Sequence, residues 1–306
     1  MAERPPMMPV PRQRRGPTPE QVRRRRLVAL ALVIVALVAA GAAIAVAVPH
    51  IRHKAAPPPT TTAPPPPKPF RIIFPEGYTR AQMAERVGAV AKIAHRKSGK
   101  HIALDAKQYL VASRTLSVPC LRPHRQTKVE GFLFPATYDF LATTTSRQLV
   151  QQQVQAFCTN WKSVNLAYAK SKNLTPYDVL TIASMIERET VAPDERPLVS
   201  AVIYNRLHQG MPLGIDATLR YGLNIPGTES IHQSQLANPT PYNTRLHTGL
   251  PPTAIANPGL ASIQAAAHPA HVNYLYFVRK PDKVHNFFTA SASAFQRYEC
   301  EHGYGC

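Results

Sequence analysis

The feature that most constrains this chain is an uncharged, apolar stretch near its N-terminus. Residues 27–48 contain no charged side chain and are rich in Leu, Val, Ala and Ile. About 20 such residues, at a helical rise of about 1.5 Å each, are enough to cross a bilayer. A cleaved signal peptide is the alternative, but its apolar region spans only about 7 to 15 residues, and no clear cleavage box precedes Pro49. We therefore expect one uncleaved transmembrane helix over residues 27–48.

The basic segment before this stretch sets the expected orientation. Residues 1–26 hold eight arginines against two glutamates and no aromatic residue, a composition typical of a disordered tail. Four consecutive arginines, residues 23–26, directly precede the stretch, which favours a cytoplasmic N-terminus. We expect a single-pass protein of the cell (inner) membrane. Much of the net charge of +19 lies beside the membrane, so we expect anionic lipid or wall polymer, and not nucleic acid, as partner.

A proline-rich segment and four cysteines characterise the part expected outside the cytoplasm. Residues 49–69 carry two proline runs, 57–59 and 64–67, which are typical of an extended, semi-rigid spacer. Beyond it, disulfides are permitted. The four cysteines, Cys120, Cys158, Cys300 and Cys306, allow three pairings and form no C-x-x-C motif. Their connectivity stays open.

Hydrophobic periodicity and turn residues predict an α+β fold. A strand (70–74), a turn and two amphipathic helices (81–94 and 103–112) form a small α+β module over residues 70–115. The larger domain, residues 128–298, has strand and turn at 128–140, a helical region at 147–166 and helices at 177–190, 198–207 and 259–268. A strand at 273–278 and its hairpin partner at 285–288 follow, and residues 299–306 form a tail.

The helix expected over residues 177–190 carries the candidate acid/base. At about 100° per residue, Glu189 falls between Met185 and Ile182, near the centre of the apolar face, whereas Glu187 lies at its margin. Partial desolvation raises the pKa of a carboxyl group, as a general acid near neutral pH requires. By itself, a glutamate in the last turn of an amphipathic helix is more often structural. Glu189 is therefore the candidate, and Glu187 is the alternate.

A series of sequence motifs indicates more closely what kind of protein this is. In chain order they are EGFLFP (130–135) with Thr137-Tyr138, IASMIERET (182–190), YNRL (204–207), GMPL (210–213), Asp216, YG (221–222), YNT (242–244), TGLPP (248–252), IANPG (255–259), AHP (267–269) and YLYF (274–277). In their order and approximate spacing they resemble the endolytic murein transglycosylase family (MltG, YceG-like). The resemblance covers residues 70–298.

The resemblance implies a membrane-anchored enzyme with a LysM-like module over 70–115 and a lytic transglycosylase domain over 128–298. Its catalytic glutamate lies within residues 187–190, where the pair Glu189-Thr190 looks like the Glu-Ser pair of other lytic transglycosylases. Two departures stand out. The family's usual Gln-Thr-Asp-Pro-Thr is here Gly-Ile-Asp-Ala-Thr (214–218), and Ala136 replaces an acidic residue.

Such an enzyme cleaves the bond between N-acetylmuramic acid and N-acetylglucosamine and leaves a 1,6-anhydro end. One carboxyl group suffices, because the nucleophile is the muramoyl 6-hydroxyl. We expect Glu130, Tyr138, Asp216, Tyr242, Asn243 and Thr244 to bind the glycan strand. No metal and no cofactor is implied, since no histidine pair has helical zinc spacing and no phosphate-binding glycine loop is present.

Two other functions stay open. A non-catalytic scaffold would hold glycan in the same groove and recruit wall-synthesis enzymes without turnover. A glycan hydrolase would need a second carboxylate, at about 5 Å or about 6.5–9.5 Å from the acid, and Asp216 is the candidate. The resemblance also implies work beside peptidoglycan polymerases, where the enzyme would terminate nascent strands.

Overall fold

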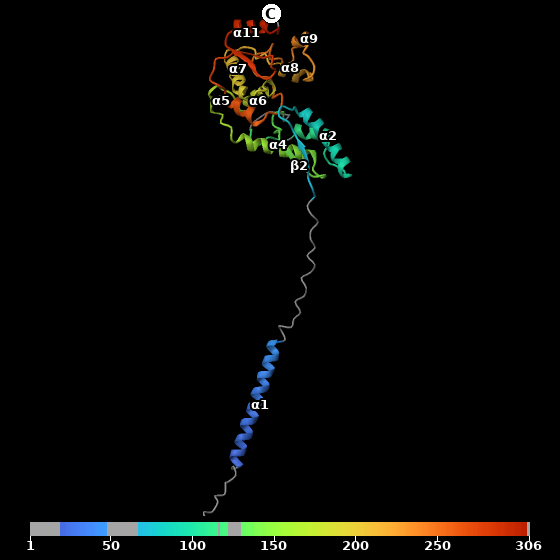
Figure 1. The fold of residues 1–306 in the computed structure, drawn as a ribbon, viewed down its shortest axis with the longest axis vertical. Helices are drawn as coiled ribbons and strands as arrows, with labels where there is room; N and C mark the ends of the chain where they lie inside the picture. Colours follow the sequence, from blue (N-terminus) through green and yellow to red (C-terminus); the bar gives the residue numbers. More distant parts are fainter. Residues whose placement is uncertain (1–18, 48–66, 116, 122–129, 305–306) are drawn as a thin grey trace, which may run out of the picture. The chain divides into compact units, whose positions relative to one another are not determined.

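The structure is a computed structural model that describes residues 19–47, 67–115, 117–121 and 130–304. The chain divides into two compact units, Met1–Pro65 and Pro66–Cys306 (Figure 1). In the first unit, helix α1 (Pro19–Ala47) begins inside the segment expected to be a disordered tail. The expected membrane span is not confirmed, because no helix in the described ranges is both long and apolar enough to cross a bilayer. Most of the expected linker, up to residue 66, lies outside those ranges.

The second unit mixes helices with two small antiparallel sheets, in agreement with the expected α+β class. Its strands are β1 (Phe70–Ile73), β2 (Thr137–Phe140), β3 (Tyr276–Arg279) and β4 (Asn286–Thr289). Its helices are α2 (Arg80–Ser98), α3 (Ala106–Thr115), α4 (Ser146–Trp161), α5 (Ala167–Ser171), α6 (Pro176–Glu189), α7 (Arg196–His208), α8 (Asp216–Leu223), α9 (Gln233–Leu236), α10 (Leu260–Ala267) and α11 (Ala292–Glu301). A 3-10 turn, Pro193–Glu195, precedes α7.

The segment expected to form a small module shares its sheet with the larger domain. Strand β1 pairs antiparallel with β2, with Phe70 opposite Phe140 and Ile73 opposite Thr137. Helix α2 follows directly and starts at a capping box in which Thr79 and Gln82 exchange hydrogen bonds. The strand and the two helices expected over residues 70–112 are confirmed as elements. The boundary between two domains stays a prediction, since both segments lie within one compact unit.

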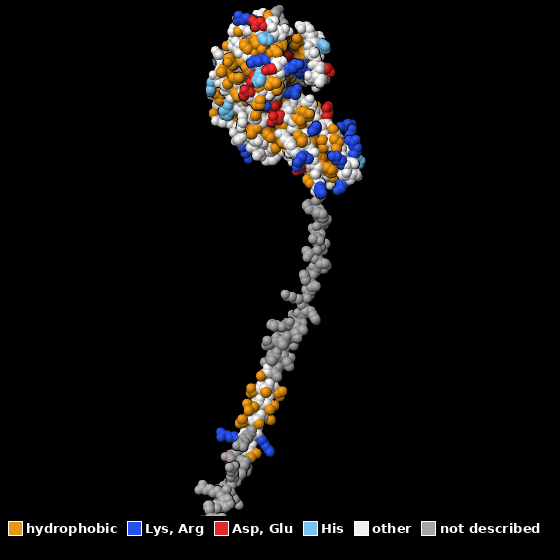
Figure 2. Space-filling view, viewed as in Figure 1, with side chains coloured by type: hydrophobic (Ala, Val, Ile, Leu, Met, Phe, Trp, Pro, Cys, Tyr) orange, Lys and Arg blue, Asp and Glu red, His pale blue; other side chains and the backbone are white. Residues whose placement is uncertain are grey.

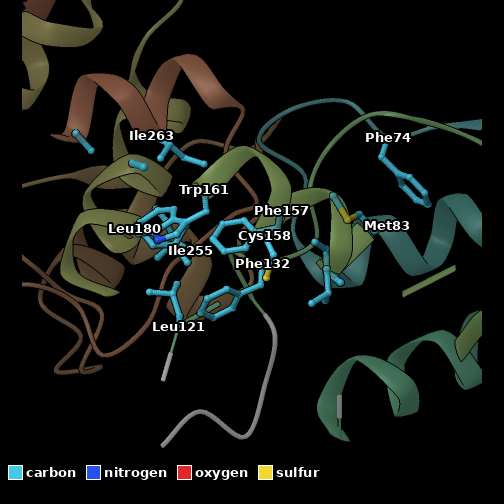
Figure 3. Close-up of a cluster of buried hydrophobic side chains, with 14 of the residues drawn as sticks. Phe74, Met83, Leu121, Phe132, Phe157, Cys158, Trp161, Leu180, Ile255 and Ile263 are labelled. Carbon is cyan, nitrogen blue, oxygen red and sulfur yellow. The ribbon is translucent and has the colours of Figure 1, made fainter. Parts of the chain in front are cut away.

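One hydrophobic core runs through the second unit (Figure 3). Phe74 and Met83 from the N-terminal elements belong to it, as do Phe132, Leu180 and Ile263 from the larger domain. Burying side chains of this size stabilises a fold by about 1.5–3 kcal/mol each, before the loss of conformational entropy is subtracted. The core therefore joins β1 and α2 to the elements that carry the candidate site.

Cys120 and Cys158 form a disulfide, which defines part of the cysteine pairing that the sequence left open. It ties the segment after α3 to helix α4, with 38 residues of separation in sequence. Cys158 is buried, and Phe157 beside it packs edge-on against Phe132 with ring centroids 5.2 Å apart. The disulfide therefore lies beside the core.

Helix α6 lies at the centre of the larger part of this unit, in contact with α7, α8 and α10. It starts as the sequence predicts, with Thr175 as the N-cap, Pro176 in the first turn and Asp178 completing a capping box. Every side chain from Val179 to Ile186 is buried. Its last residue is Glu189, and Thr190 continues in an extended conformation. The candidate acid is thus held at the end of a helix that packs on all sides.

Four details differ from expectation. The helical region at 147–166 ends at Trp161, because Asn160 and Ser163 bond to nearby backbone carbonyls, and the Asn165 side chain accepts from the N–H of Ala167, the first residue of a new helix, α5. Residues 216–223, to which the sequence analysis assigned no element, form α8. The short helix α9 and the C-terminal helix α11 were not expected. The hairpin of β3 and β4 is confirmed.

Candidate functional site

Glu189 lies where the end of α6 meets the start of α8. It is half-buried, and the backbone N–H of Ala217, in the first turn of α8, donates a hydrogen bond to its carboxylate. The first N–H groups of a helix have no intrahelical partner and carry partial positive charge, so they suit an anion. The guanidinium of Arg279, at the end of β3, donates to the Glu189 backbone carbonyl. Three elements therefore position this residue.

Burial raises the pKa of the Glu189 carboxyl above its usual value. The negative charge of Asp216 raises it further, whereas the Ala217 N–H, Arg279 and Arg188 act in the opposite direction. Desolvation disfavours the charged form, and so does a neighbouring anion. The result is a partly accessible carboxyl group with increased affinity for its proton, as a general acid requires.

Asp216 is the first residue of α8 and forms an ion pair with Arg245. Arg245 Nε and Nη2 donate to the same oxygen, Asp216 Oδ1, at 3.0 and 2.5 Å. Both side chains are about half exposed. The site therefore places a carboxylate and a guanidinium side by side next to Glu189, at a surface that substrate can reach.

Asn243 and Thr244, expected to bind substrate, are both fully buried. The Asn243 amide donates to the backbone carbonyls of Leu236 and Asn238, and its oxygen accepts from the Arg245 N–H. The Thr244 hydroxyl accepts from the Ile215 N–H at 3.0 Å and lies 2.9 Å from the Thr218 hydroxyl. Their contacts hold the loop that presents Arg245 to Asp216. A direct role in glycan binding stays a prediction.

Tyr242 packs against α8. Its ring lies edge-on to Tyr221 with centroids 5.1 Å apart, and its hydroxyl is 2.8 Å from that of Thr253. A Cβ at Gly222 would approach the Tyr242 Cβ to 2.7 Å, so only glycine allows this packing. Gly214, one of the departures from the family pattern, has φ +64°, a conformation that glycine adopts without strain.

Glu187, the alternate candidate, is engaged in structural contacts. Its carboxylate accepts from the Gly259 N–H at 2.9 Å and lies 4.0 Å from Arg196. Only 7% of its side chain is exposed. Glu76 lies against the same glycine, where a Cβ would meet its carboxylate. Burial and the charge of Glu187 raise the pKa of Glu76, while Arg196 lowers it. These contacts favour Glu189 as the acid.

Glu130 and Tyr138 lie inside the fold. The Glu130 carboxylate accepts from the Arg80 N–H, the Asn257 amide and the Tyr221 hydroxyl, at 2.9, 2.9 and 3.2 Å. Burial raises the pKa of Glu130 to about 7, although these donors counteract it. Tyr138 donates to the Phe134 carbonyl at 2.7 Å and is buried. Their expected role in substrate binding stays a prediction, and what the structure shows is a role in packing.

The first three residues of the YNRL motif (204–207) hold segments of the chain that border the site. Each of its side chains donates to backbone carbonyls of distant segments: Tyr204 to Ala266, Asn205 to Val272 and Tyr274, and Arg206 to Leu213 and Leu275. Arg206 also lies over the Tyr276 ring, 5.3 Å from its centroid. The segments before α8 and before β3 are therefore held to one helix, α7.

Three groups near Glu189 were not anticipated from the sequence: the Arg279 and Arg245 side chains and the Ala217 N–H. Arg245 directly follows the YNT motif and Arg279 lies two residues after the YLYF motif, but nothing in the spacing shows that Arg245 meets Asp216 or that Arg279 meets Glu189. A backbone N–H has no sequence signal at all. Within the ranges that the structure describes, no cluster of His, Cys, Asp or Glu could hold a metal ion.

Comparisons with known proteins agree with this architecture. Residues 56–299 match the YceG-like family. An endolytic murein transglycosylase of Streptococcus pneumoniae strain R6 is 30% identical over 249 residues, which are 76% of this chain and 44% of the relative. Another, of Bacillus subtilis strain 168, is 36% identical over 152 residues, which are 50% of this chain and 42% of the relative.

The fold also has a counterpart among solved structures. The crystal structure of a putative YceG-like protein from Listeria monocytogenes matches with a TM-score of 0.62 and 26% identity, covering 74% of this chain and 75% of that one. The chain spans less than half the length of the curated relatives that it matches. Since the family match covers well over half of this sequence, the chain belongs to the YceG-like family.

Proposed function

We propose that this chain is an endolytic murein transglycosylase that uses Glu189 as its single acid/base. The observation that carries the proposal is the setting of Glu189: a half-buried carboxyl with a raised pKa, at a helix end, beside an accessible ion pair. The names of the relatives from Streptococcus pneumoniae and Bacillus subtilis support murein as the substrate.

In the proposed reaction, protonated Glu189 donates its proton to the glycosidic oxygen between N-acetylmuramic acid and N-acetylglucosamine. The bond from muramoyl C1 to that oxygen breaks, and an oxocarbenium-like centre develops at C1. The Glu189 carboxylate then takes the proton of the muramoyl 6-hydroxyl, whose oxygen bonds to C1. The products are a 1,6-anhydro end and a free hydroxyl on the departing sugar, and no water is consumed.

The Asp216–Arg245 pair favours this route over hydrolysis. A retaining hydrolase needs a free carboxylate as nucleophile, and an inverting one needs a carboxylate that can take a proton from water. Asp216 Oδ1 accepts two hydrogen bonds from one guanidinium, so this oxygen is already engaged by Arg245 and is not free to attack the sugar or to take a proton from water. We propose that Asp216 adjusts the charge around Glu189 and does not attack the sugar.

The test is mass spectrometry of products from uncrosslinked glycan strands incubated with the full chain in detergent. We expect anhydro-ended fragments from the wild type and from Glu187→Gln, which keeps an acceptor for the Gly259 N–H. Glu189→Gln should lower the rate by a factor of about 10²–10⁴, the usual contribution of a general acid. Reducing ends in place of anhydro ends would establish hydrolysis. Intact strands that still bind would establish a scaffold.

We further propose that the protein works at the cell membrane, with its N-terminus in the cytoplasm and its second unit outside, and terminates nascent strands beside peptidoglycan polymerases. The sequence of residues 1–48 supports this location. Protease treatment of intact spheroplasts should remove the second unit and spare an epitope at the N-terminus. If protease digested the second unit only after lysis, the proposed orientation would be wrong.

A further inference from the structure

Helix α2 and the loop after it carry an exposed basic surface that the proposed reaction does not use. We define the α2 basic surface as Lys92, Arg96, Lys97 and Lys100, all of which are exposed. Figure 2 shows Lys and Arg side chains gathered over α2, at the edge of the second unit. Lys92 and Arg96 are four residues apart, so they lie on one helix face about 6 Å apart along the axis. Lys97 follows Arg96 in the last turn and Lys100 lies just beyond the end of the helix, so the four cations gather around the C-terminal end of α2.

The chain around this surface lacks acidic residues. Between Glu85 and Asp105 it contains neither Asp nor Glu. None of the four cations takes part in any of the ion pairs found in the described parts of the chain. Arg86, by contrast, is occupied, because its Nε donates to the Ile73 carbonyl at 3.1 Å. Four like charges thus stand together, and no acidic side chain in the described ranges forms an ion pair with any of them.

Helix stability explains only part of this arrangement. Cations in the last turn of a helix interact favourably with its dipole, and Arg96 and Lys97 lie there. Lys92 lies more than a turn from the helix end, and Lys100 follows Gly99, which ends the helix in a left-handed conformation. Like charges at positions four apart, as in Lys92 and Arg96, destabilise a helix. A ligand of opposite charge would remove that cost.

We propose that the α2 basic surface binds a linear, phosphate-bearing polymer. Lys and Arg side chains bind phosphate oxygens strongly, and several neighbouring cations can bind successive phosphates of one polymer. A membrane surface fits less well, because the apolar side chains of α2 (Met83, Ala84, Val87 and Ala94) are buried in the core. Of its large aliphatic side chains only Ile93 is exposed, at 42%. Helices that lie in a membrane interface need a broad free apolar face.

The first test is a lysine-labelling footprint on the full chain, read by mass spectrometry, with inorganic polyphosphate as the probe. We expect Lys92, Lys97 and Lys100 to be protected, while Lys170 and Lys172, which are exposed on and after α5, keep their reactivity. Because the readout is local, binding of polyphosphate to the arginine-rich N-terminal segment does not affect it. Unchanged labelling of the three lysines would overturn the proposal.

Two variants test the charge itself. Changing the four residues of the α2 basic surface to Gln should weaken polyphosphate binding by about tenfold or more at low salt and flatten its salt dependence. The control changes Arg147, Lys162, Lys170 and Lys172 to Gln, an equal loss of exposed charge, and should weaken binding far less. Equal losses in both variants would mean that only net charge matters, and would overturn the proposal.

Two further probes test the class of ligand. Phosphatidylglycerol vesicles at equal phosphate concentration should protect the three lysines less than polyphosphate does. A neutral N-acetylglucosamine oligomer should not protect them. Stronger protection by vesicles would assign the surface to the membrane, and protection by the neutral oligomer that salt does not weaken would assign it to glycan. Either result would overturn the proposal.

Discussion

Several groups from different parts of the chain act on the Glu189 carboxyl in opposite directions. Its burial and the charge of Asp216 favour the protonated form, while the Ala217 N–H and two arginines favour the carboxylate. A general acid that must later act as a base needs a pKa near the working pH. The groups around Glu189 therefore set the pKa that the proposed reaction needs, and single substitutions can test them one at a time.

Among these groups, the Ala217 N–H distinguishes this chain from the family pattern that it resembles, which has proline, and so no N–H, at this position. Ala217→Pro removes the donor but suits the first turn of α8, where no intrahelical bond depends on that N–H. Losing a bond to the charged form raises the pKa of Glu189. Since the proposed reaction starts from the protonated acid, the alkaline limb of kcat/KM should move to higher pH. Ala217→Ser, which keeps the N–H, should leave the limb in place.

Asp216→Asn should act in the opposite direction. Removing an anion that faces Glu189 lowers the pKa of that carboxyl, so the alkaline limb should move to lower pH. A pH–rate profile on uncrosslinked glycan strands measures both variants. Anhydro ends should still form in Asp216→Asn, at a reduced rate. Complete loss of turnover at every pH would mean that Asp216 takes part directly, as a hydrolase requires.

The preference for Glu189 over Glu187 stays a prediction, and it rests on helical geometry together with the resemblance of Glu189-Thr190 to the Glu-Ser pair of lytic transglycosylases. The faces of α6 follow from a fixed angle per residue, and Glu187 and Glu189 project differently. What surrounds them depends on segments up to about 90 residues away, such as Arg279. Asn243 and Thr244 show the same limit, because a polar motif can equally bind substrate or support the loop beside it.

At the scale of elements, the Cys120–Cys158 disulfide connects the end of the α3 segment to α4. Four cysteines with no diagnostic spacing left the pairing open, since a disulfide depends on which Cα atoms meet in the fold. Elements with caps, in contrast, could be predicted: α2 and α6 each start at a threonine with a partner three residues on. Helix α8 has no side-chain cap, but neither have α7 and α10, which were predicted, so the missing cap alone does not explain why α8 was missed.

The disulfide should contribute strongly to stability. With 38 residues of separation, loop-closure entropy predicts a stabilisation of about 4 kcal/mol. We expect the double variant Cys120→Ala/Cys158→Ala to lose about 2–4 kcal/mol of unfolding free energy in a urea titration. The only tryptophan, Trp161, stacks on Phe157 next to Cys158 and provides the fluorescence signal. A loss under about 1 kcal/mol would mean that the reduced, unfolded chain is already compact.

On the scale of the whole molecule, Glu130 connects parts of the second unit that are far apart in sequence. Its carboxylate receives donors from the start of α2, from α8 and from Asn257. Asn257 in turn donates to the Tyr78 carbonyl and accepts from the Leu133 N–H, both at 2.9 Å. The GFLFP and IANPG motifs thus meet in one buried hydrogen-bond network. The sequence showed both motifs but not that they touch.

This network should make global stability depend on pH. The pKa of Glu130 is about 7 in the folded chain, against about 4.5 when unfolded. Between these values the folded state binds more protons, so stability is highest below the lower value and falls as pH rises towards 7. The loss should be at most about 3 kcal/mol.

The variant Glu130→Gln tests this, because its side chain cannot titrate. Urea titrations from pH 4.5 to 7 should show no such decline in the variant. Its stability should be lower at every pH, since the amide accepts fewer hydrogen bonds than the carboxylate. Equal slopes in both proteins would show that the donors from Arg80, Tyr221 and Asn257 already hold Glu130 as a carboxylate.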